Sequence, residues 1–554
     1  MSNDDKTSPD VDQEDLLLSL IELDVDLWPE PVQRHLQPLG RTGPTTFCES
    51  LPVEIQCYIF TLCLTTTYNP VPWAKRPPLS LACVSRQWRH IVLATPRLWQ
   101  AIHVRPHGYR SKRRGPEEHD AAIQRRMNGV STWIARAARL PLSISLIAPR
   151  NYDEASLDGL LEVIFRVSAQ WKSIGFVMPS SWLQRRNHFP DNHRPTSLES
   201  ITVKFTGLFY WQNNFALTEI LPWLHSPQLR HLSLYHCNAA SFAPRLTGLT
   251  QLVLDGFIHE DFILPTNALR LLHCCPMLET CYLQLRQPRE EDSPADKIEL
   301  SVPESSISLP QLTRLCIRAA TSDHELRRFY DALDCPRLVQ FEVKKHWSSV
   351  NDICDSPTFL PMLVRSQSCI TILVLASNFV HTVNALLLDS LRSIPTLKEL
   401  HITEPSDRCT LPVEQALTNR FFAAFTIPDE NANSEDVLCP ALELLYAQPS
   451  RASNAAILRM IRSRRSLNMN SIGVARLQRV VVRIAREETH TVEQILGDAE
   501  EEELVELRKG GLYVYILDPF EPLPSRKPPS RWPVLGTWGE DVGSPDALEA
   551  WDML

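Results

Sequence analysis

Glycine is scarce in this 554-residue chain, which holds 17 glycines against 43 prolines. Phosphate-binding loops need several glycines close together, because their backbone must approach the phosphate oxygens closely. The motifs G-x-x-x-x-G-K-[ST], G-x-S-x-G and H-E-x-x-H do not occur either. The local signatures of phosphate-binding loops, hydrolase nucleophiles and zinc proteases are therefore missing, and we expect no catalytic residue.

The chain also lacks an excess of positive charge and long apolar runs. Its formal net charge is −9, which argues against a nucleic-acid-binding protein. No uncharged apolar run approaches the roughly 18 residues that a membrane span needs. The first 30 residues are acidic and carry no secretory signal pattern. We therefore expect a soluble protein of the cytoplasm, the nucleus or both, which binds neither nucleic acid nor membrane.

None of the 14 cysteines forms a C-x-x-C pair, so the usual spacing of zinc ligands is absent. His231 and His236, or His273 beside Cys274 and Cys275, are the nearest approach to a ligand cluster. Isolated His and Cys within apolar segments are more often core or surface residues. We expect no metal and no cofactor.

A repeated phrase runs through most of the chain. It reads apolar-x-x-apolar-x-apolar, usually with a proline or another turn residue two positions earlier, and its mean step is about 31 residues. The first apolar residues of its ten copies are Leu198, Leu229, Leu249, Leu278, Leu312, Leu338, Ile370, Leu397, Leu442 and Leu477. A weaker copy begins at Trp171.

Between copies lie segments with helical periodicity, such as Leu387, Leu391 and Ile394, which ends just before Pro395. One strand and one helix cannot bury their apolar faces alone, so neighbouring units must stack. The pattern predicts an irregular strand–helix solenoid over residues 121–518. Its widest gap, from Leu397 to Leu442, contains the polar stretch Asp429–Asp436 and is expected to protrude as a loop.

A different pattern precedes the array, in a helical block from Leu51 to Ile102. Pro52 and Glu54 favour a helix start, and Ile55, Ile59 and Leu62 then fall on one helical face. A second segment follows a proline-rich interruption. These short helices carry more apolar surface than about 50 residues can bury among themselves, which indicates a binding partner.

The residues of this block resemble the F-box, the helical motif by which substrate receptors dock on the Skp-type adaptor of a cullin-RING ubiquitin ligase. The resemblance rests on LPVEI at 51–55, the pair Ile59–Phe60, VSRQWR at 84–89 and the closing Leu98–Trp99. The interruption Thr65–Pro78 is longer than in compact members, but the block looks like the F-box proteins expanded in mushroom-forming fungi. The resemblance implies adaptor-binding residues Leu51, Pro52, Glu54, Ile55, Ile59, Phe60, Leu81 and Val84, with Trp88 supporting the motif's own core.

The expected fold class is α/β, an F-box helical motif followed by an irregular leucine-rich-repeat-like solenoid. The expected segments are an acidic lead and linker (1–47), the F-box (48–102), a basic and acidic loop (103–120), the solenoid (121–518) and a proline-rich tail (519–554). The resemblance implies a non-catalytic substrate receptor, whose partners are a Skp-type adaptor, through it a cullin, and an unidentified target protein. The alternative is a leucine-rich-repeat scaffold with a ligase-independent F-box.

The target would sit on the strand face that the helices leave uncovered. Side chains alternate along a strand, so residues flanking the inward apolar positions should point to solvent. Tyrosine and arginine dominate binding hot spots, and arginine pairs with acidic or phosphorylated segments. The candidate target-binding residues are Tyr235, Tyr282, Arg314, Arg318, Glu342, Lys344, His401, Arg479 and Arg483.

Overall fold

The structure is a computed structural model. It describes residues 51–64, 69–72, 76–106, 116–148, 152–179, 195–206, 221–224, 226–235, 246–256, 263–287, 306–345, 358–366, 369–376, 384–403, 417–427, 437–465, 473–484 and 498–517. The predicted acidic lead, the basic part of the first loop, the polar stretch 429–436 and the tail lie outside these residues. The chain divides into two compact units, with described residues 51–234 in the first and 235–517 in the second. This division falls inside the predicted solenoid and not at the end of the helical block.

The first unit begins with the predicted helical block. It consists of α3 (Val53–Leu62), α4 (Leu79–Ala82), α5 (Arg86–Leu93) and the 3-10 helix η2 (Pro96–Trp99). Pro52 precedes α3 and Glu54 lies in its first turn, as the sequence indicated. The Ser85 side chain accepts a 3.1 Å hydrogen bond from the Trp88 N–H and so caps α5.

The helical block continues directly into a sheet, which corrects the predicted boundaries at 102/103 and 120/121. Strand β1 (Ala101–Val104) pairs in parallel with β2 (Leu142–Ile147), and helix α6 (Pro116–Arg136) lies between them in sequence. Strand β1 has only four residues, which is too short for alternating apolar and polar residues to reveal a strand in the sequence. The acidic residues read as part of a loop instead belong to the start of α6, where an initial proline and early acids favour a helix.

Three further strands complete the sheet of the first unit: β3 (Trp171–Pro179), β4 (Ser200–Thr206) and β5 (His231–Tyr235). Its other helices are α7 (Glu154–Arg166), η3 (Ser168–Gln170) and α9 (Leu221–Leu224). The pairs β2–β3 and β3–β4 are parallel. The part of the proline-rich interruption that is described covers the outer edge of β1, where the His103 N–H donates to the Pro70 carbonyl at 2.8 Å.

The second unit repeats strand and helix. Its main strands are β6 (Gln251–Asp255), β7 (Thr280–Arg286), β9 (Arg314–Ala320), β11 (Gln340–Lys345), β12 (Ile372–Ala376), β13 (Glu399–Thr403), β14 (Leu444–Ser450), β15 (Arg479–Ile484) and β16 (Tyr513–Leu517). They follow one another in chain order, and all neighbouring pairs are parallel. The short strands β8 (Ile307–Ser308) and β10 (Leu333–Asp334) form a separate parallel pair. Over both units, the described strands of the large sheet number 14.

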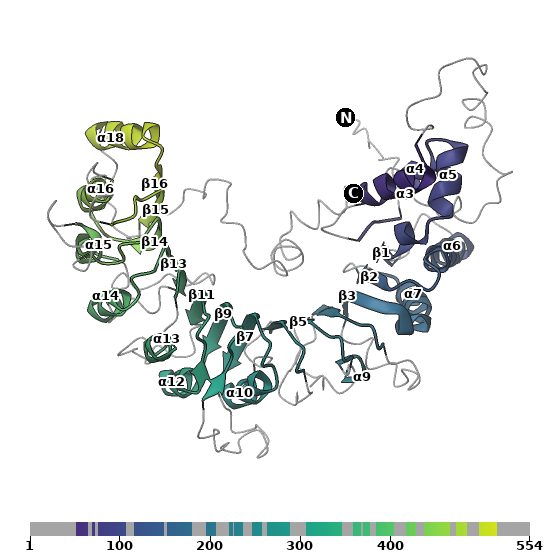
Figure 1. Ribbon diagram of the computed structural model, residues 1–554, viewed down its shortest axis with the longest axis horizontal. Coiled ribbons are helices and arrows are strands. Elements are labelled where there is room, and N and C mark those ends of the chain that lie inside the picture. The colour runs from purple at the N-terminus through teal and green to yellow at the C-terminus, as the bar shows by residue number, and fades with distance from the viewer. Residues whose placement is uncertain are drawn as a thin grey trace, which may run out of the picture. The chain divides into compact units, whose positions relative to one another are not determined.

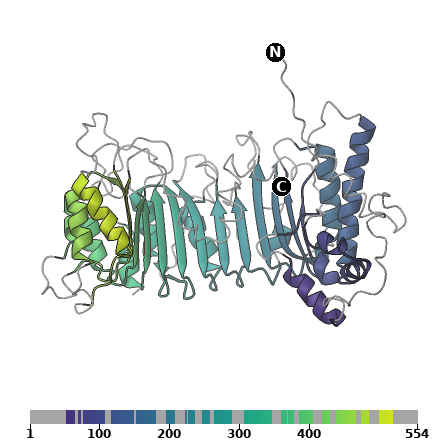
Figure 2. The same cartoon turned by 90° about the horizontal axis from the view of Figure 1, so that it is seen from above.

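The helices of the second unit lie on one side of its strands (Figure 1), and the strands run side by side (Figure 2). The helices are α10 (Pro265–His273), α12 (Asp323–Asp331), α13 (Leu360–Arg365), α14 (Asn384–Arg392), α15 (Asn419–Phe425), α16 (Asn454–Ser463) and α18 (Asp498–Lys509). Together, the two units bear out an open, solenoid-like α/β fold.

The repeated sequence phrase locates the strands. In all ten copies the strand begins two residues after the first apolar residue, as Leu312 precedes β9 and Leu477 precedes β15. That first apolar residue is buried in every copy. A backbone ladder joins the strand starts of the second unit. The Glu279 carbonyl accepts hydrogen bonds from the N–H groups of Thr313 and Arg314. The Thr313 carbonyl in turn accepts from the N–H groups of the first residue of β11 and of the residue before it. The ladder is unbroken from Thr250 to Arg479, so the copies stack as the pattern predicted.

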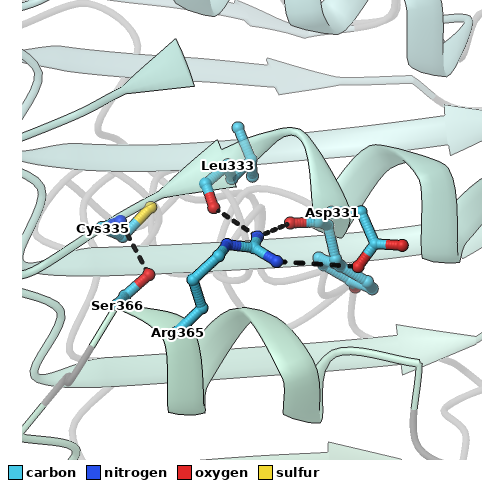
Figure 3. Close-up of polar contacts among 6 residues, drawn as sticks. Asp331, Leu333, Cys335, Arg365 and Ser366 are labelled. Atoms are coloured by element: carbon cyan, nitrogen blue, oxygen red, sulfur yellow. Dashed lines mark hydrogen bonds and ion pairs between the residues drawn. The ribbon is translucent and has the colours of Figure 1, made fainter. Parts of the chain in front are cut away.

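Arginine side chains join neighbouring repeats on the helix side. Arg365, at the end of α13, donates to the carbonyls of Tyr330 and Leu333 at 2.9 and 2.8 Å and lies 3.8 Å from Asp331 (Figure 3). Beside it, Ser366 accepts a hydrogen bond from the Cys335 N–H. These contacts tie the end of α13 to the C-terminal end of α12 and to β10, the elements of the preceding repeat.

The widest gap of the pattern is not only a loop. Helix α15 lies within it and buries Phe421, Phe422 and Phe425. The fully buried Arg464 of the next repeat donates to the carbonyls of Phe425, Leu438 and Cys439. The expectation of a protruding loop over 397–442 is therefore wrong for its described part, because aromatic residues next to each other in sequence gave no clear helical period.

Candidate protein-binding surfaces

Exposed apolar side chains are concentrated on the helical block. In the described part of the chain, the large apolar residues that are exposed there are Val53, Ile55, Tyr58, Ile59, Leu62, Val84 and Leu93, with Leu62 65% exposed. Elsewhere Met277, Val339, Val364 and Val505 are exposed one at a time on different elements. We call the seven residues of the block the apolar surface. Exposed apolar side chains gathered on one small block are a candidate surface for another protein.

The structure places most of the predicted adaptor-binding residues on this side of the block. Pro52, Glu54, Ile55, Ile59 and Val84 are exposed, and Leu51 is half-buried. Tyr58 and Leu62 are also exposed but were not in the predicted set, although their spacing of four residues on α3 places them on one face.

Phe60 and Leu81 are corrections to the predicted set, because both are buried. The ring of Phe60, only 1% exposed, lies 4.7 Å from the ring of Trp88 in the interior of the block. Trp88 therefore supports the core of the block, as expected. Phe60 and Leu81 hold the exposed helices in place and do not present a surface themselves.

The second candidate surface is the strand side without helices. Phe341, the second residue of β11, packs against Tyr330 and Phe359 on the helix side. The first, third and fifth residues of strands β6–β16 consequently face the other way, and we call this the open face. Across β7, β9 and β11, the register places Tyr282, Cys316 and Glu342 in one row of it.

Three of the predicted target-binding residues do not point to solvent. Tyr235, Tyr282 and Glu342 are buried, with Tyr282 only 1% exposed. Arg314, Arg318, Lys344, His401, Arg479 and Arg483 are half-buried. The expectation failed because neighbouring strands place large side chains beside one another, so residues on the open face cover each other even where no helix packs on them.

Charges on the open face of β6–β11 compensate each other. Lys344 pairs with Glu342 at 2.8 Å, and the Arg318 guanidinium lies over the Tyr282 ring at 5.5 Å. Burial by itself lowers the pKa of Arg318, but Tyr282, Asp255, Cys316 and Glu342 around it raise that pKa overall. The Gln284 amide joins the group by donating to Asp255 and to the Tyr282 hydroxyl. We call this group the compensated cluster.

The open face of β14–β16 has a different character. Leu444, Tyr446, Arg479, Tyr513 and Tyr515 are all half-buried there, and we call these five residues the terminal patch. The register places Leu444 beside Arg479 and Arg479 beside Tyr513. The Arg479 guanidinium lies over the Tyr513 ring at 4.5 Å, and the rings of Tyr513 and Tyr515 are 4.7 Å apart.

The buried cysteines of the second unit have strongly shifted thiol pKa values. Burial raises the pKa of the Cys275 and Cys335 thiols to about 12, so both stay protonated and unreactive. Within the described residues, no group of three or more His, Cys, Asp or Glu side chains is placed to hold a metal ion. His231, His273, Cys274 and Cys275 thus make no metal cluster with described neighbours, and His236 lies outside the described residues.

Comparisons with known proteins do not assign a family. No protein-family model matches the chain, and no curated protein sequence matches it. Among the described helices, none is both long enough and apolar enough to cross a lipid bilayer.

Proposed function

We propose that this protein is the substrate-recognition subunit of a Skp–cullin–F-box type ubiquitin ligase. The helical block is its F-box and binds a Skp-type adaptor, which links it to a cullin. The strand–helix array binds the target protein. The receptor does no chemistry itself and acts by holding the target near the conjugating enzyme.

The observation that carries this proposal is the apolar surface of the helical block. A folded block buries Phe60, Leu81, Leu98 and Trp99 yet leaves Ile55, Ile59, Leu62 and Val84 exposed. Apolar burial contributes about 1.5–3 kcal/mol for each large aliphatic side chain, so covering this surface would give a stable complex. Of these exposed residues, Ile55, Ile59 and Val84 are also positions at which the sequence resembles the F-box.

The direct junction between the helical block and the sheet supports a receptor in which the block binds the adaptor and the array binds the target. Trp133 of α6 donates a 3.1 Å hydrogen bond to the Ala101 carbonyl of β1, and its ring packs edge-on against Trp99 at 4.7 Å. Arg136 lies over the same Trp99 ring at 4.7 Å. The end of the helical block is thus fixed to the first strands of the array, as a receptor requires if adaptor and target are to be held at a set distance.

Co-purification tests the proposal and separates it from the ligase-independent alternative. The tagged full-length chain would be mixed with recombinant Skp-type adaptor, cullin and RING subunit, and the bound subunits identified. We expect all of them to be recovered. Adaptor without cullin would favour the ligase-independent scaffold, and recovery of neither would refute the proposal.

A further inference from the structure

The two stretches of the open face differ in how their cations are balanced. In the compensated cluster, acidic groups surround Arg318, and Lys344 pairs with Glu342. An incoming anion would have to compete with carboxylates that are already in place. This stretch, which includes two of the predicted target-binding arginines, is therefore poorly suited to bind an acidic ligand.

Arg479 in the terminal patch has no such balance. Its neighbours on the adjacent strands are Leu444 and Tyr513, and its guanidinium forms no hydrogen bond or ion pair with any described residue. The acidic residue in the same row is Glu399 on β13, which lies two strands away, about 10 Å, and is 3.5 Å from His401. The positive charge of Arg479 is held in place by the Tyr513 ring, and no described carboxylate pairs with it.

Tyr513 and Tyr515 add apolar area beside Arg479, together with hydroxyl groups that can bind a ligand. The hydroxyls of Tyr513 and Tyr515 make no hydrogen bond to a described residue, while their rings pack on each other. The Arg508 guanidinium lies 5.1 Å from the Tyr515 ring and donates to the Val514 carbonyl, so it fixes the strand next to the patch. Rigid aromatic side chains beside an arginine are typical of binding hot spots.

We propose that the terminal patch binds an extended segment of the target protein that carries an anionic side chain flanked by apolar ones. Arg479 donates hydrogen bonds to a carboxylate or a phosphate, and Leu444, Tyr446, Tyr513 and Tyr515 pack against the flanking side chains. This inference rests on the proposed function, because it specifies what the array reads. Among the arginines predicted to bind the target, it assigns the recognition of acidic segments to Arg479 and not to Arg314 or Arg318.

A selection from random peptides tests the site without a known target. A phage-displayed library of random 12-residue peptides is panned against the immobilised full-length chain, and the selected sequences are compared with the starting library. We expect enrichment of Asp and Glu next to apolar residues. The enrichment should vanish with Arg479→Gln and remain with Arg314→Gln, a matched change at the same strand position in β9. No selected peptide, or no enrichment of acids, would refute the proposal.

The best peptide is then titrated by fluorescence anisotropy in three forms, with Glu, with Gln and with phosphoserine at the enriched position. Glu→Gln in the peptide and Arg479→Gln in the protein should each weaken binding about tenfold or more. The two changes together should cost little beyond either alone, because they remove one interaction. Tighter binding of the phosphoserine form would identify phosphate as the anion, and tighter binding of the Glu form a carboxylate. Equal weakening by Arg314→Gln would place the site elsewhere and overturn the proposal.

Two controls separate this inference from the proposed function. Arg479→Lys keeps the charge and should retain part of the affinity, which a general loss of folding would not allow. Adaptor binding by the same variants should be unchanged. Adaptor binding with no acid-selective peptide would refute the terminal patch alone, and peptide binding without adaptor binding would refute the ligase function and leave the patch.

Discussion

The ring of Trp88 packs on the ring of Phe60, with centroids 4.7 Å apart. This contact divides helix α3 into an inner side, with Phe60 and Gln56 buried, and an outer side that carries Ile55, Ile59 and Leu62. The outer side is therefore exposed although the inner side of α3 is packed against α5. Loose attachment of the helix is not the reason for the exposure.

Replacing Phe60 with alanine should destabilise the helical block by about 3–5 kcal/mol, because the change leaves a cavity against Trp88. Ile59→Ala, on the exposed side of the same turn, should change stability by about 0.5 kcal/mol or less. Hydrogen exchange of the amides in α5, measured on the full-length chain, reports the difference. Equal protection in the two variants would show that Phe60 does not organise the block.

Acid should weaken the junction between the block and the sheet through His103. Burial, and secondarily the charge of Arg105, lower the pKa of His103 from 6.5 to about 4, while its Nδ1 lies 2.9 Å from the Ser145 hydroxyl. The unfolded chain binds a proton at His103 below pH 6.5 and the folded chain only near pH 4. Stability from this group is thus complete above pH 6.5 and falls by on the order of 3 kcal/mol as the pH drops to 4.

The measurement is the unfolding free energy of the first unit's transition at pH 7.5 and pH 5, for the natural chain and for His103→Asn. Asparagine can still bond to Ser145 but does not titrate. The variant should therefore lose less stability on acidification. The same pH dependence in both proteins would exclude His103 as the cause.

Removing the guanidinium of Arg365 should loosen the end of α12. Arg365→Met keeps the aliphatic stem but removes the side-chain donor to the carbonyls of Tyr330 and Leu333 (Figure 3). We expect a loss of about 2 kcal/mol and faster hydrogen exchange in α12 and α13. Arg392→Met is the control, because the described partner of Arg392 is the exposed Asp389 on its own helix. Identical effects of both changes would mean that Arg365 does not join the repeats.

The compensated cluster predicts that Arg318 stabilises the fold. Arg318→Met would leave Asp255 and Glu342 without its charge, at a cost on the order of 3 kcal/mol. Lys344→Met, which removes a more exposed partner of Glu342, should cost less. Thermal unfolding of the two variants provides the comparison. A stable Arg318→Met protein would contradict a structural role and return Arg318 to the candidate binding residues.

The positions of the strands were predictable because the pattern that sets them is local. A turn, one buried residue such as Leu312, and two further apolar residues within a few positions define each copy. The exposure of the open face was not predictable in the same way. Tyr282 and Glu342 are buried by side chains of neighbouring strands, tens of residues away in sequence. Without the register, one sequence does not show which side chains lie beside them.

The helical block shows the same limit on a smaller scale. The order of its apolar residues predicted short helices and a surface for a partner, and the exposure of Ile55, Ile59 and Val84 agrees with that surface. The inward direction of Phe60 depends on Trp88, which is contributed by a different helix. Periodicity on one helix does not decide which of two adjacent apolar residues faces inward.

The most direct test of the central claim is a titration of the full-length chain with a recombinant Skp-type adaptor. Val84 in the helical block and Val364 on α13 are nearly equally exposed, at 57% and 56%, so Val84→Asp and Val364→Asp place the same charge on similar surroundings. We predict that the natural chain and Val364→Asp bind the adaptor with the same affinity, and that Val84→Asp binds at least about 100-fold more weakly, since a buried, unpaired carboxylate costs several kcal/mol. Undiminished binding of Val84→Asp, or no binding by the natural chain, would contradict the account.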